Sequence, residues 1–294
     1  MPSTRNFSDE LERLRREVDE ADAIVVGAGA GLSTAAGMSY SGPRFERWFS
    51  AWRERYGFSD MYAGGFHPFR TLGETWGFWS RNIMANRYEP GATPLYRRLV
   101  EMLAGHDHFV LTTNVDHQFQ LAGEPRETLF YTQGDYGLFQ CSTPCHARTY
   151  DNEAQVREMA RAVDEKVARQ RAAGVPERLM DLSVPDDLVP RCPVCGEPMA
   201  MNLRCDDTFV EDDGWHAAAR RYEAYLDAHK RGRVLYLELG VGSNTPVIIK
   251  YPFWRRVEKN PDATYVCVNM GQTYAPGSIA DRSILLDGDI AQVF

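Results

Sequence analysis

The sequence predicts an α/β protein built on a doubly wound, Rossmann-like parallel sheet, with a small helical and cysteine-containing module inserted into it. Apolar, strand-like runs alternate with helix-like segments towards both ends of the chain, as a parallel sheet requires. The first run ends in glycines at alternate positions, Gly27, Gly29 and Gly31, which is typical of a strand that turns tightly into a helix. Two close pairs of cysteines interrupt the alternation between these ends.

Length and charge exclude several classes of protein. The 294 residues can bury a full core, as one large domain with an insertion or as two modest domains. A formal charge of −8 argues against general electrostatic binding to nucleic acid or to an anionic membrane. We find no apolar run of about 18 residues, and the charged N-terminus resembles neither a secretory signal nor a transit peptide. We therefore expect a cytoplasmic protein with neither nucleic acid nor membrane as partner.

The N-terminal third predicts a helix, the glycine turn and a helical insertion. Ser8 is a suitable helix cap, and Leu11, Leu14 and Val18 follow at helical spacing. Residues 37–70 are rich in aromatic side chains without clean periodicity, which predicts a helical subdomain with an aromatic core. Within it, only residues 38–45 follow the glycines closely enough to form a mobile loop over a ligand.

The glycine turn predicts a cradle for a pyrophosphate. Residues 23–33 read A-I-V-V-G-A-G-A-G-L-S. Glycine lets the backbone approach a phosphate, and the N–H groups at a helix start favour an anion. The spacing differs from the dehydrogenase G-x-G-x-x-G, and Glu46, near the distance of a ribose-binding acid, does not follow a strand-like run. A hydride-transferring oxidoreductase is thus the weaker interpretation, and a tight turn that binds nothing is the plain alternative.

Two predicted strands in the middle of the chain end in polar residues. Thr93-Pro94 predicts the start of a helix that Gly105 ends. Residues 108–111 predict a strand followed by Thr112-Thr-Asn-Val-Asp116, and residues 129–131 predict another followed by Gln133-Gly-Asp135. Polar residues just beyond parallel strands lie where open α/β sheets bind ligands.

The C-terminal part returns to the α/β pattern. Strands are expected at residues 234–239, 265–268 and 283–286, the first two followed by Gly240-Val-Gly-Ser-Asn244 and by Asn269. Helices are expected at 152–173, as a solvated helix, at 214–230, and at 246–259, where Pro252 should kink or shorten the helix.

The paired cysteines predict a structural zinc site. Cys141, Cys145, Cys192 and Cys195 supply four thiolates, which complete a tetrahedral site and leave no position open for water. The segment between the pairs is longer than in usual zinc ribbons, and His146 is the alternative to one thiol. Cys205 and Cys267 lack close partners and are interpreted as buried cysteines.

Together and in this order, the motifs resemble the sirtuin family of NAD-dependent enzymes. Gly27-Ala-Gly-Ala-Gly-Leu-Ser33 is similar to the family's glycine-rich signature, Thr112-Thr-Asn-Val-Asp116 to its T-Q-N-I-D segment, and the four cysteines to its zinc module. Tyr40-Ser-Gly-Pro-Arg-Phe45 replaces the family's Asp-Phe-Arg, so that only Arg44 is a counterpart. The resemblance implies NAD as co-substrate, in contact with Gly27, Ala28, Gly29, Ala30, Gly31, Ser33, Arg44, Asn114, Asp116, Gln133, Gly242, Ser243, Asn244 and Asn269.

On this basis we expect a Rossmann-like NAD-binding domain over residues 1–136 and 211–294. A helical insertion is expected at about residues 40–92, and a zinc-binding insertion at residues 137–210.

One departure from the family changes the expected chemistry. Deacylating sirtuins carry a His-Gly pair whose histidine is the general base, whereas this chain has Gln133-Gly134. A glutamine amide hydrogen-bonds but does not titrate near neutral pH, so it cannot accept a ribose hydroxyl proton as imidazole can. The chain in this respect resembles the macrodomain-linked microbial sirtuins. That resemblance implies ADP-ribosyl transfer to a lipoyl-carrier protein of the glycine-cleavage H type, and a partner macrodomain that removes the ADP-ribose.

We expect Asn114, Gln133 and Asp135 to be the catalytic residues. Asn114 and Asp116 would position the nicotinamide ribose and carboxamide, and Gln133 would hold ribose hydroxyls. Fixed dipoles in a dry pocket can stabilise the oxocarbenium-like centre without a base. Asp135 would orient or deprotonate the acceptor, or else stabilise a turn. The alternatives are an NAD-dependent protein lysine deacylase, in which Asp135 or water replaces the base, and a catalytically silent NAD or ADP-ribose sensor.

Overall fold

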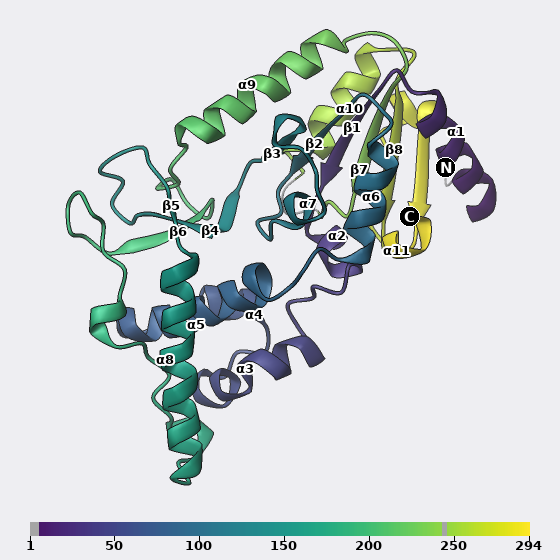
Figure 1. Cartoon of the computed structure of the whole chain (residues 1–294). Coiled ribbons are helices and arrows are strands. Elements are labelled where there is room, and N and C mark those ends of the chain that lie inside the picture. The colour runs from purple at the N-terminus through teal and green to yellow at the C-terminus, as the bar shows by residue number, and fades with distance from the viewer. Residues whose placement is uncertain (1–5, 243–245) are drawn as a thin grey trace. The chain divides into compact units, whose positions relative to one another are not determined.

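The computed structural model describes residues 6–242 and 246–294 and divides them between two compact units (Figure 1). Unit 1 comprises the described residues of Met1–Gly37, Ala92–Gln133 and Asp213–Phe294. Unit 2 comprises Met38–Gly91 and Gly134–Asp212.

Unit 1 is built on a parallel sheet whose described strands follow the order β3-β2-β1-β7-β8-β9 (Figure 1). The chain moves outwards from β1 first on one side and then on the other, so the order reverses between β1 and β7. This confirms the doubly wound fold. The strands are β1 (Ala23–Ala28), β2 (His108–Thr112), β3 (Leu129–Tyr131), β7 (Val234–Leu239), β8 (Thr264–Asn269) and β9 (Ser283–Asp287).

Helices cover both faces of this sheet because alternate strand residues point to opposite sides. Val26 and Leu237 belong to the core beneath the first group of helices, whereas Val25 and Tyr236 belong to the core beneath the second. The first group is α1 (Phe7–Glu20), α2 (Ala30–Ala35), α6 (Pro94–Leu103), α7 (Gln118–Leu121) and α11 (Ile290–Val293). The second group is α9 (Asp213–Ala228) and α10 (Lys250–Lys259). Unit 1 also contains the 3-10 turns η2 (Arg126–Thr128) and η5 (Gly277–Arg282).

Two helix starts differ from the sequence prediction. The cap of α1 is Asn6, whose side chain accepts a hydrogen bond from Asp9 N (2.9 Å), so the assignment to Ser8 is wrong. Helix α10 begins at Lys250 rather than at residue 246. That start places Pro252 in the first turn, where its missing N–H has no helical partner to lose. Proline thus shortens this helix, as expected.

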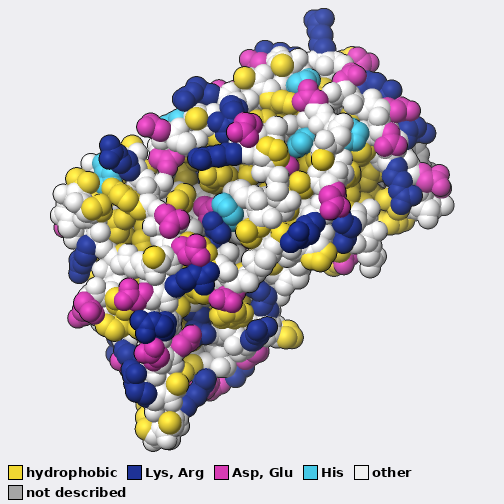
Figure 2. Space-filling view, viewed as in Figure 1, with side chains coloured by type: hydrophobic (Ala, Val, Ile, Leu, Met, Phe, Trp, Pro, Cys, Tyr) yellow, Lys and Arg dark blue, Asp and Glu magenta, His cyan; other side chains and the backbone are white. Residues whose placement is uncertain are grey.

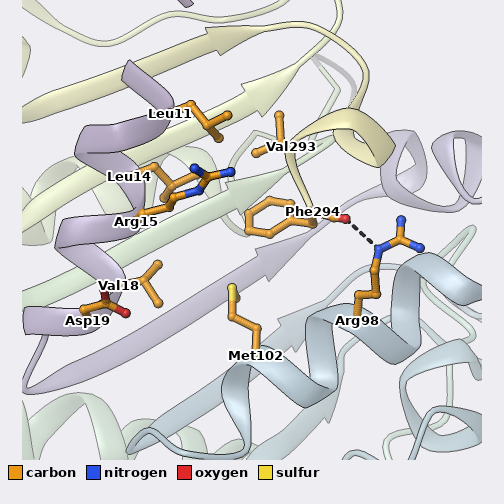
Figure 3. A pocket seen from close by; sticks show the side chains of 9 residues that line it. All are labelled: Leu11, Leu14, Arg15, Val18, Asp19, Arg98, Met102, Val293 and Phe294. Atoms are coloured by element: carbon orange, nitrogen blue, oxygen red, sulfur yellow. Dashed lines mark hydrogen bonds between the residues drawn. The ribbon is translucent and has the colours of Figure 1, made fainter. Parts of the chain in front are cut away.

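A hollow of about 410 Å³ lies in unit 1 on the side of α1, α6 and α11 (Figure 3). Apolar side chains such as Leu14 and Met102 line it, and Arg98 Nε donates to Phe294 O (2.6 Å) at its edge. None of the predicted site residues lines this hollow. Its shape therefore does not locate the candidate site, which must be found from the chemistry at the strand ends.

A buried histidine–glutamate pair lies where β2 begins. His108 Nε2 is 3.0 Å from Glu124 Oε1, and His108 Nδ1 is 2.9 Å from His106 O. Since both ring nitrogens face oxygen acceptors, the doubly protonated ring is favoured. Burial lowers the pKa of His108, but the hydrogen bonds with Glu124 and His106 and the nearby carboxylate charges outweigh burial and raise this pKa.

We expect this pair to stabilise the fold more at acidic than at alkaline pH. A histidine with a raised folded pKa contributes fully below its unfolded pKa, and the contribution is lost as the pH rises through the folded pKa. The loss of unfolding free energy in Glu124→Gln should therefore be larger at about pH 6 than at about pH 8.5. Urea unfolding at both pH values measures it, and an equal loss at both would contradict the assignment.

Unit 2 combines helices with a small antiparallel sheet. Its helices are α3 (Pro43–Tyr56), α4 (Met61–Gly65), α5 (Leu72–Ile83), the π-helical turn η1 (Met84–Tyr88) and α8 (Glu153–Ala172). The described sheet has the order β5-β4-β6, with β4 (Gly134–Cys141), β5 (Tyr150–Asp151) and β6 (Met199–Leu203), and the turns η3 (Glu177–Leu179) and η4 (Asp186–Leu188) follow α8.

The helices of unit 2 confirm the predicted aromatic core. The rings of Phe45, Phe49 and Phe78 are buried, and the Phe49 and Phe78 centroids lie 5.2 Å apart. Helix α8 is less solvated than expected, because Val156 and Val163 on one of its faces are fully buried. It is therefore an amphipathic helix.

The visible surface carries charged side chains of both signs. On the face shown in Figure 2, lysine and arginine side chains are interspersed with acidic ones. Among the described residues, no helix is long and apolar enough to cross a bilayer.

Candidate active site

The carboxyl ends of β1, β2 and β3 bring three predicted site segments of unit 1 to one edge of the sheet. The Thr132 amide donates to Thr112 O (3.0 Å), which joins the end of β3 to that of β2. The Asn114 side chain donates to Gly29 O (3.0 Å), which joins the residues after β2 to the glycine turn. Gln133 directly follows Thr132 and is half-buried. The glycine turn, Asn114 and Gln133 therefore belong to one edge, as parallel strands require.

Three buried oxygen atoms surround the amide nitrogen of Asn114 and share its two N–H groups. Its Nδ2 lies 3.0 Å from Gly29 O, 3.1 Å from Ser33 Oγ and 3.1 Å from Tyr96 Oη. A carbonyl oxygen can only accept, so the nitrogen, and not the oxygen, of the Asn114 amide must face Gly29. The amide oxygen is then the atom that remains for a ligand.

A chain of hydroxyl groups links this amide to Asp116. Ser33 Oγ donates to Asp116 Oδ2 (2.5 Å), which uses the only hydroxyl proton of the serine. The contact of 2.8 Å between Tyr96 Oη and Ser33 Oγ must therefore use the proton of the tyrosine. Asp116 Oδ1 accepts from Gln118 N (3.1 Å), so both carboxylate oxygens are bound. Ser33, Asn114 and Asp116, which the sequence predicted separately, form one network.

Tyr96 is the member of this network that sequence analysis missed. Helical spacing places it beside the apolar residues Leu95 and Leu99 of α6, where an aromatic ring is interpreted as core. Tyr96 is fully buried, and burial, followed by the charge of Asp116, raises its pKa well above the usual value. The phenol therefore stays protonated and can donate. Its hydroxyl group on an otherwise apolar helix face is the signal in the sequence that points to such a role.

The three glycines of the turn are explained by packing against protein. A Cβ on Gly27 would lie 2.3 Å from a methyl carbon of Ile249, in front of α10. Cβ atoms on Gly29 and Gly31 would lie 2.7 and 2.8 Å from the main chain of Gly240, after β7. The alternating glycines thus let two neighbouring segments of unit 1 approach closely, independently of any phosphate.

The amide groups of the turn are only partly available to an anion. Gly29 N donates to Leu239 O, and Gly31 N donates to Gly240 O, both at 2.9 Å. Within the described residues, the Ala30 amide is the one of these three that has no acceptor. The predicted cradle therefore offers fewer free amides than the sequence suggested.

The remaining predicted NAD residues of unit 1 follow β7 and β8. Asn269 ends β8, and its side chain donates to Val241 O (3.0 Å), which ties the two strand ends together. Gly242 has open space where a side chain would project. Ser243 and Asn244 lie outside the described residues.

Two predicted residues belong to unit 2. Arg44 donates to Ser39 O (3.0 Å) and to Ala85 O (2.6 Å), so its guanidinium binds main-chain carbonyl groups. Asp135 Oδ1 accepts from Gly137 N (2.7 Å) and from Arg87 Nε (2.9 Å). The contact between Asp135 and the amide two residues on is the turn-stabilising arrangement considered from the sequence.

The four cysteines form a compact cluster in unit 2. Their Sγ atoms all lie within 4.8 Å of one another, with 3.6 Å between Cys141 and Cys195 and 3.7 Å between Cys145 and Cys192. A tetrahedral zinc site with metal–sulfur bonds of about 2.3 Å has edges of about 3.8 Å, so the cluster has the dimensions that zinc needs. Four thiolates leave no open position, which fits a structural role.

The other cysteines and His146 lie outside this cluster. His146 Nδ1 is 2.9 Å from Cys145 Sγ, and its Nε2 is 2.8 Å from Tyr150 Oη, so the ring lies beside the sulfur atoms rather than among them. Cys267 is buried in β8, as expected. Cys205 is exposed, so its interpretation as a buried cysteine is wrong.

We expect Cys192→Ser to release the metal and lower the Tm. In structural zinc sites, the binding free energy, on the order of 10 kcal/mol, contributes directly to folding. Elemental analysis and thermal melting measure the two effects. Cys205→Ser, at an exposed cysteine outside the cluster, is the control and should change neither. An intact, zinc-free and active Cys192→Ser protein would contradict the structural assignment.

Fold and site together define an α/β protein with a doubly wound parallel sheet and a four-cysteine cluster able to hold zinc. The sheet order reverses between β1 and β7, and the Ser33–Asn114–Asp116 network lies at the ligand-binding edge beside that reversal. Solved structures share this fold. Sir2Tm bound to a propionylated peptide has a TM-score of 0.56 and 18% identity, over 96% of this chain and 94% of that one. A Sir2 homologue in complex with NAD has a TM-score of 0.57 and 14% identity, over 96% and 90%.

Sequence comparison identifies the family more narrowly, although no protein-family model matches the chain. A protein ADP-ribosyltransferase of Staphylococcus aureus (strain Mu50) is 39% identical over 283 residues, which are 96% of this chain and 85% of that protein. A probable bifunctional ADP-ribose hydrolase/ADP-ribosyltransferase of Fusarium oxysporum f. sp. cubense is 32% identical over 250 residues. These cover 82% of this chain but 39% of the fungal protein. The chain belongs to the protein ADP-ribosyltransferase family and has the sirtuin fold.

Proposed function

We propose that this chain transfers ADP-ribose from NAD to a lipoyl-carrier protein of the glycine-cleavage H type and releases nicotinamide. A partner macrodomain ADP-ribosyl hydrolase would remove the modification. The enzyme class rests on the family, and NAD as co-substrate rests on the NAD complex of a protein with the same fold. The carrier and the macrodomain rest on the resemblance stated for Gln133-Gly134.

The strand ends of unit 1 fit a ligand that carries hydroxyl and carboxamide groups. The Thr132 hydroxyl, next to Gln133, is buried and has no hydrogen-bond partner among the described residues. Among the described residues, the side-chain hydrogen bonds of Asn114 use its Nδ2, so its amide oxygen would accept from the ligand. The Ala30 amide adds a donor suited to a phosphate oxygen. These groups would form hydrogen bonds with the hydroxyl, carboxamide and phosphate groups of the nucleotide.

The residues of this edge would act by stabilising the charge that develops in the transition state and by orienting the nucleotide. When bound, NAD supplies ADP-ribose: the bond from C1′ to nicotinamide breaks, a bond from C1′ to the acceptor forms, and the acceptor's proton leaves to solvent. Asn114 would fix the nicotinamide ribose and carboxamide together with Asp116, whose carboxylate is held by Ser33. Groups held this rigidly stabilise developing charge without reorganising.

The observation that favours transfer to a protein over deacylation is that Gln133 stands where deacylating sirtuins carry a histidine. It lies at the end of β3, beside the end of β2 that leads to Asn114, so it would meet the ribose hydroxyls. Its amide can hold those hydroxyls but cannot remove a proton from them. C1′ then stays available to an acceptor side chain.

NAD labelled in its adenosine half tests the proposal. The chain is incubated with lipoylated carrier, unlipoylated carrier or an acetylated peptide, and free nicotinamide is measured in parallel. We expect label on the lipoylated carrier together with nicotinamide release. Loss of the acetyl group without protein labelling would instead show a deacylase. NAD binding without nicotinamide release in any arm would show a sensor.

A further inference from the structure

Hydrogen bonds hold the main chain just beyond β3 on two sides. The Thr132 amide donates to Thr112 O (3.0 Å) at the end of β2, and Trp215 Nε1 in the first turn of α9 donates to Thr132 O (3.0 Å). All three residues belong to unit 1, as does Gln133. Both polar main-chain groups of Thr132 are therefore bound, each by a different element.

The carbonyl that Trp215 binds belongs to the peptide bond between Thr132 and Gln133. A peptide bond is planar, so Thr132 O lies in one plane with the nitrogen and Cα of Gln133. A hydrogen bond to this oxygen restrains the orientation of the plane, and with it the position from which the Gln133 side chain projects. Trp215 thus acts on Gln133 through a single peptide unit.

Strand β3 by itself gives this peptide little support. It has three residues and lies at the edge of the described sheet, with β2 as its neighbouring strand. The end of such a strand opens more readily than a central strand, because few hydrogen bonds hold it. A donor from α9 adds a restraint at the point where the pairing with β2 ends.

Packing within unit 1 holds the donor in turn. The Trp215 ring meets the buried Phe130 ring of β3 edge-on, with centroids 5.1 Å apart and an angle of 74° between the planes. Further along α9, Arg221 donates to Arg126 O (2.9 Å) and Glu127 O (3.1 Å) of η2. The indole N–H is therefore carried by a helix that is tied to β3 and to the turn before it.

We infer that Trp215 is a positioning residue for Gln133, because its indole N–H holds the Thr132–Gln133 peptide where the Gln133 amide meets the ribose hydroxyls. A displacement of about 1 Å in a group that orients a substrate can cost about 100-fold in rate. The indole is a donor only, so Trp215 restrains geometry and transfers no proton. The inference rests on the proposed function, in which Gln133 holds those hydroxyls.

Trp215→Phe removes the donor and keeps an aromatic ring against Phe130. We expect the kcat for nicotinamide release to fall about 10- to 100-fold while the KM for NAD changes less than about threefold. Rates are measured at a temperature where thermal melting shows that the variant is folded. A kcat within about twofold of the wild-type value would overturn the inference.

A double-mutant cycle with Gln133→Ala tests whether Trp215 acts through Gln133. In the Gln133→Ala background no amide remains to be misplaced, so Trp215→Phe should lower the rate less than about twofold further. Single-turnover release of labelled nicotinamide, with protein in excess over NAD, measures these slow variants. An equal fold loss in both backgrounds would show that Trp215 acts independently of Gln133, and would overturn the inference.

Arg221→Met is the matched control. Arg221 lies on the same helix and also donates to main-chain carbonyl groups, but these groups precede β3, whereas Thr132 follows it. We expect a lower Tm with an unchanged kcat. A fall in kcat as large as that of Trp215→Phe would show that loosening α9 in general slows the reaction, which overturns the specific role of Trp215.

The wild-type protein distinguishes failure of this inference from failure of the proposed function. Normal transfer by the wild type combined with any contrary variant result overturns only the role of Trp215. A wild type that releases nicotinamide without labelling a carrier overturns the transferase, while the rate ratios for nicotinamide release still test the positioning. A wild type that binds NAD and releases no nicotinamide overturns both.

Discussion

Asn114→Ala is expected to lower nicotinamide release and ADP-ribosyl transfer at least about 100-fold, the effect of removing a fixed dipole that stabilises a charged transition state. The variant loses the amide oxygen that faces the ligand edge. It also leaves Gly29 O, a buried acceptor, without its side-chain donor. We therefore expect a second, smaller effect, a loss of about 1–3 kcal/mol in the free energy of unfolding.

A matched asparagine separates these two effects. Asn260 is also buried in unit 1, and its Nδ2 donates to Gly232 O (2.9 Å), but it precedes β8 at the opposite end of the sheet. Asn260→Ala should lose similar stability and keep its activity at temperatures below its Tm. Rates are measured with saturating NAD at a temperature where both variants are folded. An Asn114→Ala protein with the wild-type rate of nicotinamide release would remove Asn114 from the mechanism.

The sheet of unit 1 could be predicted because its strands are local signals. The run Val234–Leu239 is apolar, and the structure has a strand with these same bounds. Polar residues after β2 and β3 could be predicted as site residues, since parallel strands align their carboxyl ends. The network that joins Ser33 to Asn114 could not be predicted, because it depends on contacts between residues 81 positions apart.

The small sheet of unit 2 could not be predicted from the sequence, for a different reason. Strand β4 pairs with β6, and residues 141 and 199 are neighbours in that pairing. The run Gly134–Cys141 lacks a clean alternation of apolar and polar residues, and its partner lies beyond α8 in the chain. Arg87 was equally hidden, because an arginine at the end of a helix is usually solvated. Its ion pair with Asp135 depends on a contact between residues 48 positions apart.

A buried ion pair in the core of unit 1 also could not be predicted from the sequence. Glu238 lies in β7 with no exposed surface, and Lys250 at the start of α10 is its ion-pair partner. Tyr265 donates to the same carboxylate (2.6 Å), as does Cys267 Sγ (3.4 Å). Burial, followed by the charge of Glu238, raises the pKa of Cys267 to about 12, so this thiol keeps its proton. A single glutamate within an apolar run gave no indication of this cluster.

Lys250→Met is therefore expected to cost about 3–5 kcal/mol in the free energy of unfolding, because it leaves a buried carboxylate without its cation. Urea unfolding at neutral pH measures the loss. In the double variant Glu238→Gln/Lys250→Met, a neutral amide still accepts from Tyr265, so most of the stability should return. The coupling between the two substitutions is the decisive quantity, since independent sites would simply add. A double variant that is as unstable as the sum of both single variants would show that the ion pair does not hold β7 and α10 together.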